Sequence, residues 1–221
     1  MQTFDTPAPI SAVVDIPAGH VRYIAADRTD TAVEVRPANP GKSRDVTMAD
    51  RTTVSYADGV LRVEARAKNQ AFGPSGAVEV TVQLPAGSRV EAKAAAAEFR
   101  GVGRLGDVTF EGAQGSIKLD EAASARLTLA AGDVTIGRLT GPAHINSDQG
   151  DISITEAVRG EVVLRTQSGN VTVDAAGGVS ASLDAGTSYG RIHNSLRNTA
   201  GTPDLAIHAT TAYGDITARS L

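Results

Sequence analysis

A Gly-Asp pair recurs through the second half of the chain, and an acidic residue beside a glycine is what a calcium loop or a phosphate cradle would use. The pairs begin at Gly106, Gly132, Gly150 and Gly214, and Asn170 takes the place of the aspartate after Gly169. A residue type that returns once per repeat favours a structural corner. Glycine adopts unusual φ values there, and Asp or Asn can hydrogen-bond to its own backbone two residues on.

Two alternatives to a structural corner would bind a cation. The calcium-binding β-roll needs tandem G-G-x-G-x-D units, and no repeat here has that pattern. A weak cation site near Asp133, Asp148 and Asp151 remains an alternative, although stacked carboxylates would repel each other unless neutralised.

Two further motifs have the letters of enzyme sites without their context. The segment "GVGRLG" (101–106) matches the dinucleotide pattern G-x-G-x-x-G, but "DVTF" follows it and predicts a strand, where a pyrophosphate site needs a helix. The segment "GTSYG" (186–190) matches the nucleophile elbow, but its surroundings predict strand-turn-strand. We therefore expect a coincidence of glycines in the first and an exposed loop serine in the second.

The histidines are His20, His144, His193 and His208, and none forms an i, i+2 or i, i+4 ligand pair. Each alternates with apolar neighbours, which predicts a solvated side chain. The chain has no cysteine, so zinc-thiolate sites and thiol nucleophiles are excluded. We predict no catalytic, cofactor-binding or metal-ligating residue, no cofactor, and a protein that is not an enzyme.

The elements that carry these residues follow a repeat. Glycines that precede an apolar-x-apolar triplet lie at 115, 132, 150, 169, 190 and 214, with separations of 17, 18, 19, 21 and 24 residues. A second set of short alternating segments lies between them. This period-2 alternation, bounded by turn residues, predicts two short strands per repeat. We expect an all-β fold, a single-stranded β-solenoid that resembles a parallel β-helix or β-roll, with two sheets and roughly 18–20 residues per coil.

The N-terminal part is less regular and predicts two regions, an irregular β cap over 1–75, continuous with the solenoid, and solenoid repeats over 76–221. Corners at Pro17–Gly19 and Pro85–Gly87 each predict the end of one strand and the start of another. Asp58-Gly59 predicts a hairpin turn.

The secondary structure of two other segments is less obvious from their composition. Arg36 to Asp45 is expected to be a loop. Val90 to Phe99 has helical composition, but its phase with the repeat favours a strand. No helix is expected with these patterns.

Composition excludes several classes of partner. The 221 residues have a formal net charge of −4 and no basic run, which excludes a nucleic-acid footprint. No segment approaches the ~20 apolar residues of a membrane span. The N-terminus has no pattern of a secretory signal, so a cytoplasmic location is expected.

The glycine-turn repeats, the segment "LPAG" (84–87) and the closing "AYGDITARSL" resemble a bacterial family, the β-strand-repeat "putative adhesin" family known as domain of unknown function 4097. The resemblance covers nearly the whole chain and implies the β-repeat fold. The family name implies adhesion, and the family supplies no catalytic residues. Abundant Ala and an excess of Arg over Lys are typical of an actinobacterial member.

Function is expected to reside in the surface. Tyr189 and Tyr213 hold equivalent positions on what the sequence presents as successive coils, so they can stack as a packing ladder or as a site for a sugar or partner. The chain stops a few residues after the last strand, which predicts an uncovered strand edge. We expect a structural or interaction module that self-associates or binds another protein. A surface adhesin or carbohydrate-binding protein is the alternative, and a polysaccharide-active enzyme is a second.

Overall fold

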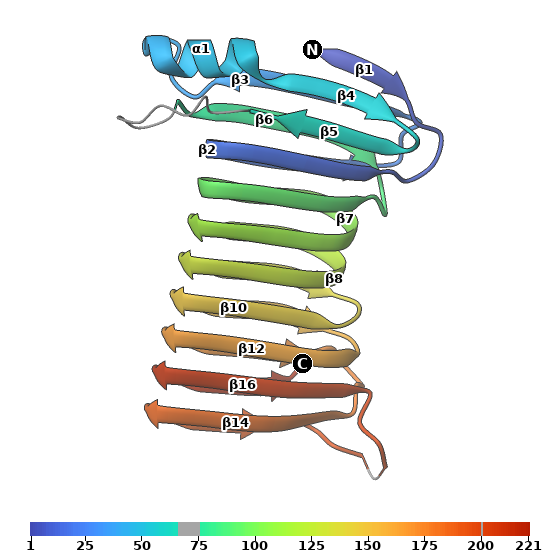
Figure 1. Cartoon of the computed structure of the whole chain (residues 1–221). Coiled ribbons are helices and arrows are strands. Elements are labelled where there is room, and N and C mark those ends of the chain that lie inside the picture. Colours follow the sequence, from blue (N-terminus) through green and yellow to red (C-terminus); the bar gives the residue numbers. More distant parts are fainter. Residues whose placement is uncertain (66–75, 200) are drawn as a thin grey trace. The chain divides into compact units, whose positions relative to one another are not determined.

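The structure is a computed structural model that describes residues 1–65, 76–199 and 201–221 (Figure 1). These residues form two compact units, Met1–Gly115 and Ser116–Leu221. Both units are built mainly of strands, so the expectation of an all-β fold is confirmed. The boundary expected at residue 75 lies at the edge of the segment 66–75, outside the described residues, and stays a prediction.

The described residues of the first unit form these elements in chain order: β1 (Gln2–Asp5), β2 (Ser11–Ala26), β3 (Asp30–Pro37), α1 (Ser43–Arg51), β4 (Thr53–Ala57), β5 (Val60–Glu64), β6 (Val78–Pro85) and β7 (Arg89–Gln114). Strand β2 is central. Its first half pairs in parallel with β5 and β7, and its second half with β6 and β7. The remaining pairs, β1 with β3, β3 with β6 and β4 with β5, are antiparallel.

Three aromatic rings form the centre of this unit. The ring centroids of Tyr23 and Phe99 lie 5.5 Å apart, as do those of Phe99 and Phe110, and all three side chains are buried. Burial raises the pKa of the Tyr23 hydroxyl, which donates to the carbonyl of Glu91 at 3.3 Å. Since Phe99 lies within β7, the strand expected over Val90 to Phe99 is confirmed.

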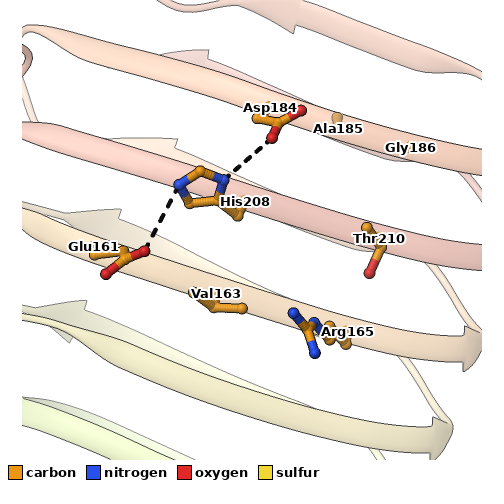
Figure 2. A pocket seen from close by; sticks show the side chains of 8 residues that line it. All are labelled: Glu161, Val163, Arg165, Asp184, Ala185, Gly186, His208 and Thr210. Carbon is orange, nitrogen blue, oxygen red and sulfur yellow. Dashed lines mark hydrogen bonds and ion pairs between the residues drawn. The ribbon is translucent and has the colours of Figure 1, made fainter.

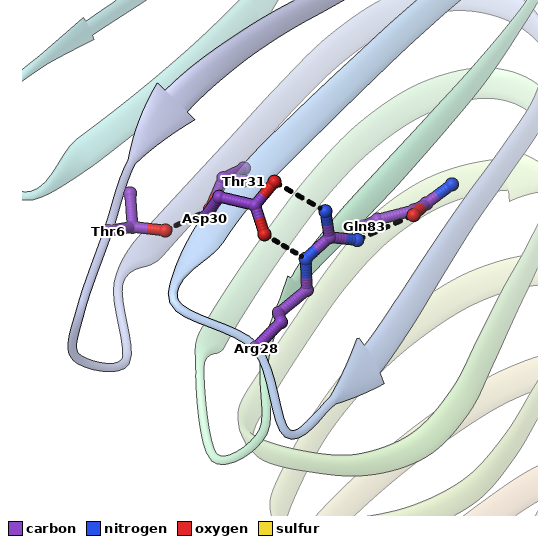
Figure 3. A network of polar contacts seen from close by, with 5 residues as sticks. All are labelled: Thr6, Arg28, Asp30, Thr31 and Gln83. Carbon is purple, nitrogen blue, oxygen red and sulfur yellow. Dashed lines mark hydrogen bonds and ion pairs between the residues drawn. The ribbon is translucent and has the colours of Figure 1, made fainter.

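A polar network fixes the start of β3 (Figure 3). The Arg28 guanidinium donates to both carboxylate oxygens of Asp30 at 2.9 Å and also to the Gln83 side chain. These hydrogen bonds hold the pKa of Asp30 below its usual value. Beside them, the Thr6 and Thr31 hydroxyls are hydrogen-bonded at 2.8 Å in a buried position. Residues from β3, β6 and the segment after β1 are thereby linked.

Two expectations for this unit need correction. The loop after β3 ends at Lys42, and residues 43–51 form helix α1, where Asp45 accepts a hydrogen bond from the Ala77 N–H at 3.0 Å. Strand β2 continues through Pro17–Gly19 and only changes its partner from β5 to β6, so that corner does not end a strand. By contrast, Asp58 and Gly59 have φ values of 51° and 74° and join the antiparallel pair β4–β5, which confirms the hairpin.

The described residues of the second unit form ten strands in chain order: β8 (Ile117–Ala131), β9 (Val134–Leu139), β10 (Ala143–Gln149), β11 (Ile152–Ala157), β12 (Gly160–Ser168), β13 (Val171–Ala175), β14 (Ala181–Tyr189), β15 (Ile192–Ser195), β16 (Leu205–Tyr213) and β17 (Ile216–Ser220). All their pairings are parallel. One series runs β8–β10–β12–β16–β14, and the other β8–β9–β11–β13–β17–β15.

We call each of the strand pairs β10–β11, β12–β13, β14–β15 and β16–β17 a coil. The coil formed by β16 and β17 is the C-terminal coil. The coils do not stack in chain order. The C-terminal coil lies between the β12–β13 coil and the β14–β15 coil (Figure 1). The expectation that the C-terminal strand forms the uncovered edge is therefore wrong, because that edge belongs to β14 and β15.

The inward residues explain this order. Ile207, Ile216 and Ala218 of the C-terminal coil are at most 1% exposed between two neighbours. In the β14–β15 coil, the residues in register with Ile216 and Ala218 are Ile192 and Asn194. An asparagine would leave its amide without water inside the stack, whereas at the end it stays exposed, so the more apolar coil takes the inner place.

No helix among the described residues is long and apolar enough to cross a membrane.

Candidate functional site

The Gly-Asp corners of the second unit form a ladder of hydrogen bonds that we call the corner ladder. Each side-chain oxygen accepts the backbone N–H of the equivalent residue in the next coil. The bonds run from Asp133 to Asp151 (2.9 Å), Asp151 to Asn170 (2.7 Å), Asn170 to Asp215 (2.9 Å) and Asp215 to Arg191 (2.8 Å). The structural explanation of these pairs is supported, but the acceptor serves the neighbouring coil and not its own turn.

The glycines beside this ladder stack just as closely. A Cβ on Gly150, which has φ of 131°, would lie 2.2 Å from the carbonyl oxygen of Gly132. A Cβ on Gly169 would lie 2.0 Å from that of Gly150. The corner therefore needs glycine both for its φ and for the close approach of the next coil.

No cation site forms at these corners among the described residues. No group of three or more acidic or histidine side chains there is arranged to hold a metal ion. Asp148 lies apart from the corner ladder and accepts a hydrogen bond from the Gln167 side chain at 2.8 Å. The alternative site at Asp133, Asp148 and Asp151 thus lacks convergent ligands.

The two enzyme-like motifs lie in strands. Residues 101–106 are within β7, with strand on both sides, so no helix N-terminus is available for a pyrophosphate. Residues 186–189 are the end of β14, and β15 begins at Ile192. The strand contexts expected for both motifs are confirmed, except that Ser188 lies in a strand and not in a loop.

The His208 side chain is 44% exposed, in agreement with the expected solvated position, and it lines a pocket on the outer face of β12, β16 and β14 (Figure 2). Its Nδ1 is 3.3 Å from the Asp184 carboxylate and its Nε2 is 3.8 Å from that of Glu161. Val163 lies opposite it in register on β12, and Arg165 lines the pocket further along that strand. No pattern in the sequence marks this cluster, because it depends on the C-terminal coil lying between the two acidic residues.

The other histidines do not converge. His20 is 3.0 Å from the Glu98 carboxylate with both side chains more than half exposed. His144 and His193 are exposed on β10 and β15. These exposed positions agree with the expectation of solvated histidines.

Tyr189 and Tyr213 stack, as expected, at one end of β14 and β16. Their ring centroids are 5.0 Å apart, the rings are inclined by 3°, and the residues are 68% and 60% exposed. They are in register across the parallel pair β14–β16. The stack follows from that register, since neighbouring strands lie ~4.8 Å apart.

The β14–β15 coil has a free edge, which we call the open end of the second unit. Each of its strands pairs with one neighbouring strand, and no other described strand pairs with its second edge. At the start of β14, the Ala181 N–H on that edge donates to the carbonyl of Arg197 at 3.0 Å. Ile192 at the start of β15 is 45% exposed, and Tyr189 at the end of β14 is 68% exposed. An unpaired parallel edge that carries exposed apolar side chains is a surface on which another strand can pair.

Comparisons with known proteins agree with this fold. The sequence model of the family described as Toastrack DUF4097 matches residues 12–219. No curated protein matches the chain. The actinobacterial origin stays a prediction.

Three solved structures are similar to this chain. The first is described as a "putative cell adhesion protein" from Clostridium sporogenes, with 8% identity, a TM-score of 0.41, and coverage of 100% of this chain and 98% of that one. Proteins described as a "putative adhesin" from Bacteroides fragilis (12% identity, TM-score 0.48) and from Parabacteroides distasonis (15%, 0.46) each match over 98% of this chain and 95% of theirs. Since the family model covers almost every residue, the chain belongs to the Toastrack family, domain of unknown function 4097.

Proposed function

We propose that this protein is a non-enzymatic structural or interaction module that self-associates through the open end of its second unit. The module is built on a single-stranded β-solenoid of two sheets, with about 18–20 residues per coil. The observation that carries the proposal is the free edge of β14 and β15, with Ile192 and Tyr189 exposed beside it.

The two strands at this edge differ in character. Strand β14 presents Leu183 and Tyr189, whereas β15 presents Ile192 at its start, followed by His193 and Asn194. Polar and charged residues on an edge oppose strand addition, and apolar residues favour it. Pairing with a second chain is therefore expected along β14 and at Ile192, the first residue of β15.

Light scattering behind size exclusion, over a hundredfold range of protein concentration, tests the proposal. We expect the mass to rise above the 22.7 kDa of one chain. Ile192→Lys places a charge on the open end at a residue already 45% exposed, so it should keep the fold and hold the mass at 22.7 kDa. Thr128→Lys adds the same charge on the exposed outer face of β8 and should not change the association. A constant mass for the unchanged protein would overturn the proposal.

The Tyr189–Tyr213 stack favours a second function, the binding of a sugar ring on an exposed aromatic surface. Glycan arrays or isothermal titration with simple oligosaccharides would test it, with Tyr189→Ala compared to Tyr56→Ala, whose ring packs against Phe4 in the first unit. Binding that Tyr189→Ala abolishes would support a carbohydrate-binding protein, and its absence would leave the stack as a packing feature. A surface adhesin must also reach the cell surface, which cell fractionation tests against the predicted cytoplasmic location.

A further inference from the structure

The C-terminal coil occupies a slot between two coils that both precede it in the sequence. Strand β16 pairs with β12 on one edge and β14 on the other, and β17 pairs likewise with β13 and β15. The β14–β15 coil and the β12–β13 coil do not pair with each other among the described residues. The C-terminal coil thus fills a site whose two walls belong to residues 160–175 and 181–195.

The contacts that hold this coil come from both walls. Asn170 accepts from the Asp215 N–H, and Asp215 accepts from the Arg191 N–H. Arg219 donates two hydrogen bonds of 2.8 Å to Asp174, which is 3% exposed.

Further contacts line both strands of the coil. His208 lies between Glu161 and Asp184, and the ring of Tyr213 stacks on that of Tyr189. These contacts depend on the residues of the coil and of the two walls. The connection between β15 and β16 adds a hydrogen bond of 2.9 Å from the Arg197 N–H to the Ser220 hydroxyl.

The order of synthesis opposes the order of stacking. The β14–β15 coil emerges before the C-terminal coil, so the C-terminal coil must enter between two coils that are already synthesised. In register through β16, Val162 aligns with Leu183, so the β14–β15 coil has an apolar pattern that could pair directly with the β12–β13 coil until it is displaced. During this interval, the C-terminal coil of another chain can enter the slot at high protein concentration.

From these observations we infer that the C-terminal coil is exchangeable between copies, and that the slot of one chain binds residues 205–220 of a second chain. The partner is a second copy, because the inward pattern, the corner acceptor and the ion pairs that the slot recognises are those of this segment. The exchange uses the same interfaces in trans that the monomer uses in cis. The exchange is a second way in which copies of this chain can self-associate, and it does not use pairing at the open end.

The chain has no cysteine, so an engineered disulfide reports which copy supplies the coil. The pair Val163→Cys with His208→Cys joins β12 to β16 at positions in register. Neighbouring strands lie ~4.8 Å apart, within the Cα separations that a disulfide spans. The pair His144→Cys with Val163→Cys joins β10 to β12 in the same way and is the control.

Both pairs are placed in the otherwise unchanged chain and refolded from denaturant at low and high protein concentration before oxidation. Ile192 is left unchanged because it lies in a wall of the slot, in register with Ile216. We expect a dimer fraction that rises several-fold with refolding concentration. In this dimer the 163/208 disulfide should link two chains, and in the monomer it should lie within one chain. The control disulfide should lie within one chain in both fractions.

Three outcomes separate the two hypotheses. A dimer whose 163/208 disulfide lies within one chain, or refolding to monomer at every concentration, overturns the exchange. If exchange fails while the unchanged chain still associates in an Ile192-dependent way, the proposed function stands alone. If exchange occurs but Ile192→Lys has no effect on association of the unchanged chain, the open end is not the site of self-association.

Discussion

The carboxylate of Asp215 accepts the backbone N–H of Arg191 at 2.8 Å, although Arg191 precedes Asp215 in the chain by 24 residues. This bond is the last of the corner ladder. Arg191 occupies the corner position of the β14–β15 coil. Its guanidinium contains only donors, so it cannot accept a backbone N–H from a further coil. The corner ladder therefore ends where the stack of coils ends.

The side chain of Asp215 should contribute to stability as a hydrogen-bond acceptor and not as a charge. Asp215→Ala should lower the free energy of unfolding by about 1 kcal/mol, because it leaves the Arg191 N–H without its partner. Asp215→Asn keeps an acceptor oxygen and should cost less than about 0.5 kcal/mol. Urea unfolding followed by circular dichroism measures both values. Equal losses in the two variants would contradict the acceptor role.

Gly150→Ala should be much more damaging than the same change at Gly186. The added Cβ at Gly150 would meet a carbonyl oxygen at 2.2 Å and strain a residue with φ of 131°, whereas a Cβ at Gly186 meets no atom within 4 Å. We expect Gly150→Ala to lower the free energy of unfolding by about 3 kcal/mol. Gly186→Ala should change it by less than about 0.5 kcal/mol. Denaturant midpoints with matched slopes provide the comparison, and similar midpoints for the two variants would refute it.

The Arg28–Asp30 pair should make the first unit sensitive to acid. Because the pKa of Asp30 is lowered by its hydrogen bonds to Arg28, the pair stabilises the fold at pH values above the ordinary aspartate range. That stabilisation is lost as the pH falls through the lowered pKa. The difference in thermal midpoint between the unchanged protein and Asp30→Asn should therefore be present at neutral pH and shrink towards zero on acidification.

The matched variant for this pair is Arg28→Gln, which removes the guanidinium and keeps Asp30. It should show the same weakened dependence on pH in that range. A difference between the unchanged protein and Asp30→Asn that stays constant from neutral to acidic pH would mean that the pair does not contribute through ionisation.

The negative charge of the buried Asp174 carboxylate should be compensated by Arg219. The carboxylate is 3% exposed and receives two hydrogen bonds from the guanidinium. Arg219→Ala should lower the urea midpoint more than Arg219→Lys, since lysine keeps the charge but not the paired geometry. Adding Asp174→Asn to Arg219→Ala should recover part of the loss, because it removes the uncompensated charge. No recovery in the double variant would show that packing, and not the ion pair, carries the effect.

Helix α1 shows why one element escaped prediction. It has nine residues, and Lys42 at its N-cap makes no side-chain capping bond. Only Asp45 and Met48 are buried, so the segment has few apolar residues to mark it as a packed helix. Asp45 is held by accepting a hydrogen bond from the N–H of Ala77, 32 residues away, and such a contact has no local signature.

The sequence by itself determined most of the strands and the Gly-Asp corners of the second unit. Each of these depends on local patterns: alternation selects inward residues such as Ile152 and Val171, and glycine is required where coils approach closely. Only the tertiary structure decided which coils are neighbours. The C-terminal coil and the β14–β15 coil have compatible registers, and the choice follows from the free energy of burying Ala218 inside the stack and leaving Asn194 exposed at its end. That order also places His208 between Glu161 and Asp184 and leaves β14 with a free edge, so both candidate sites depend on it.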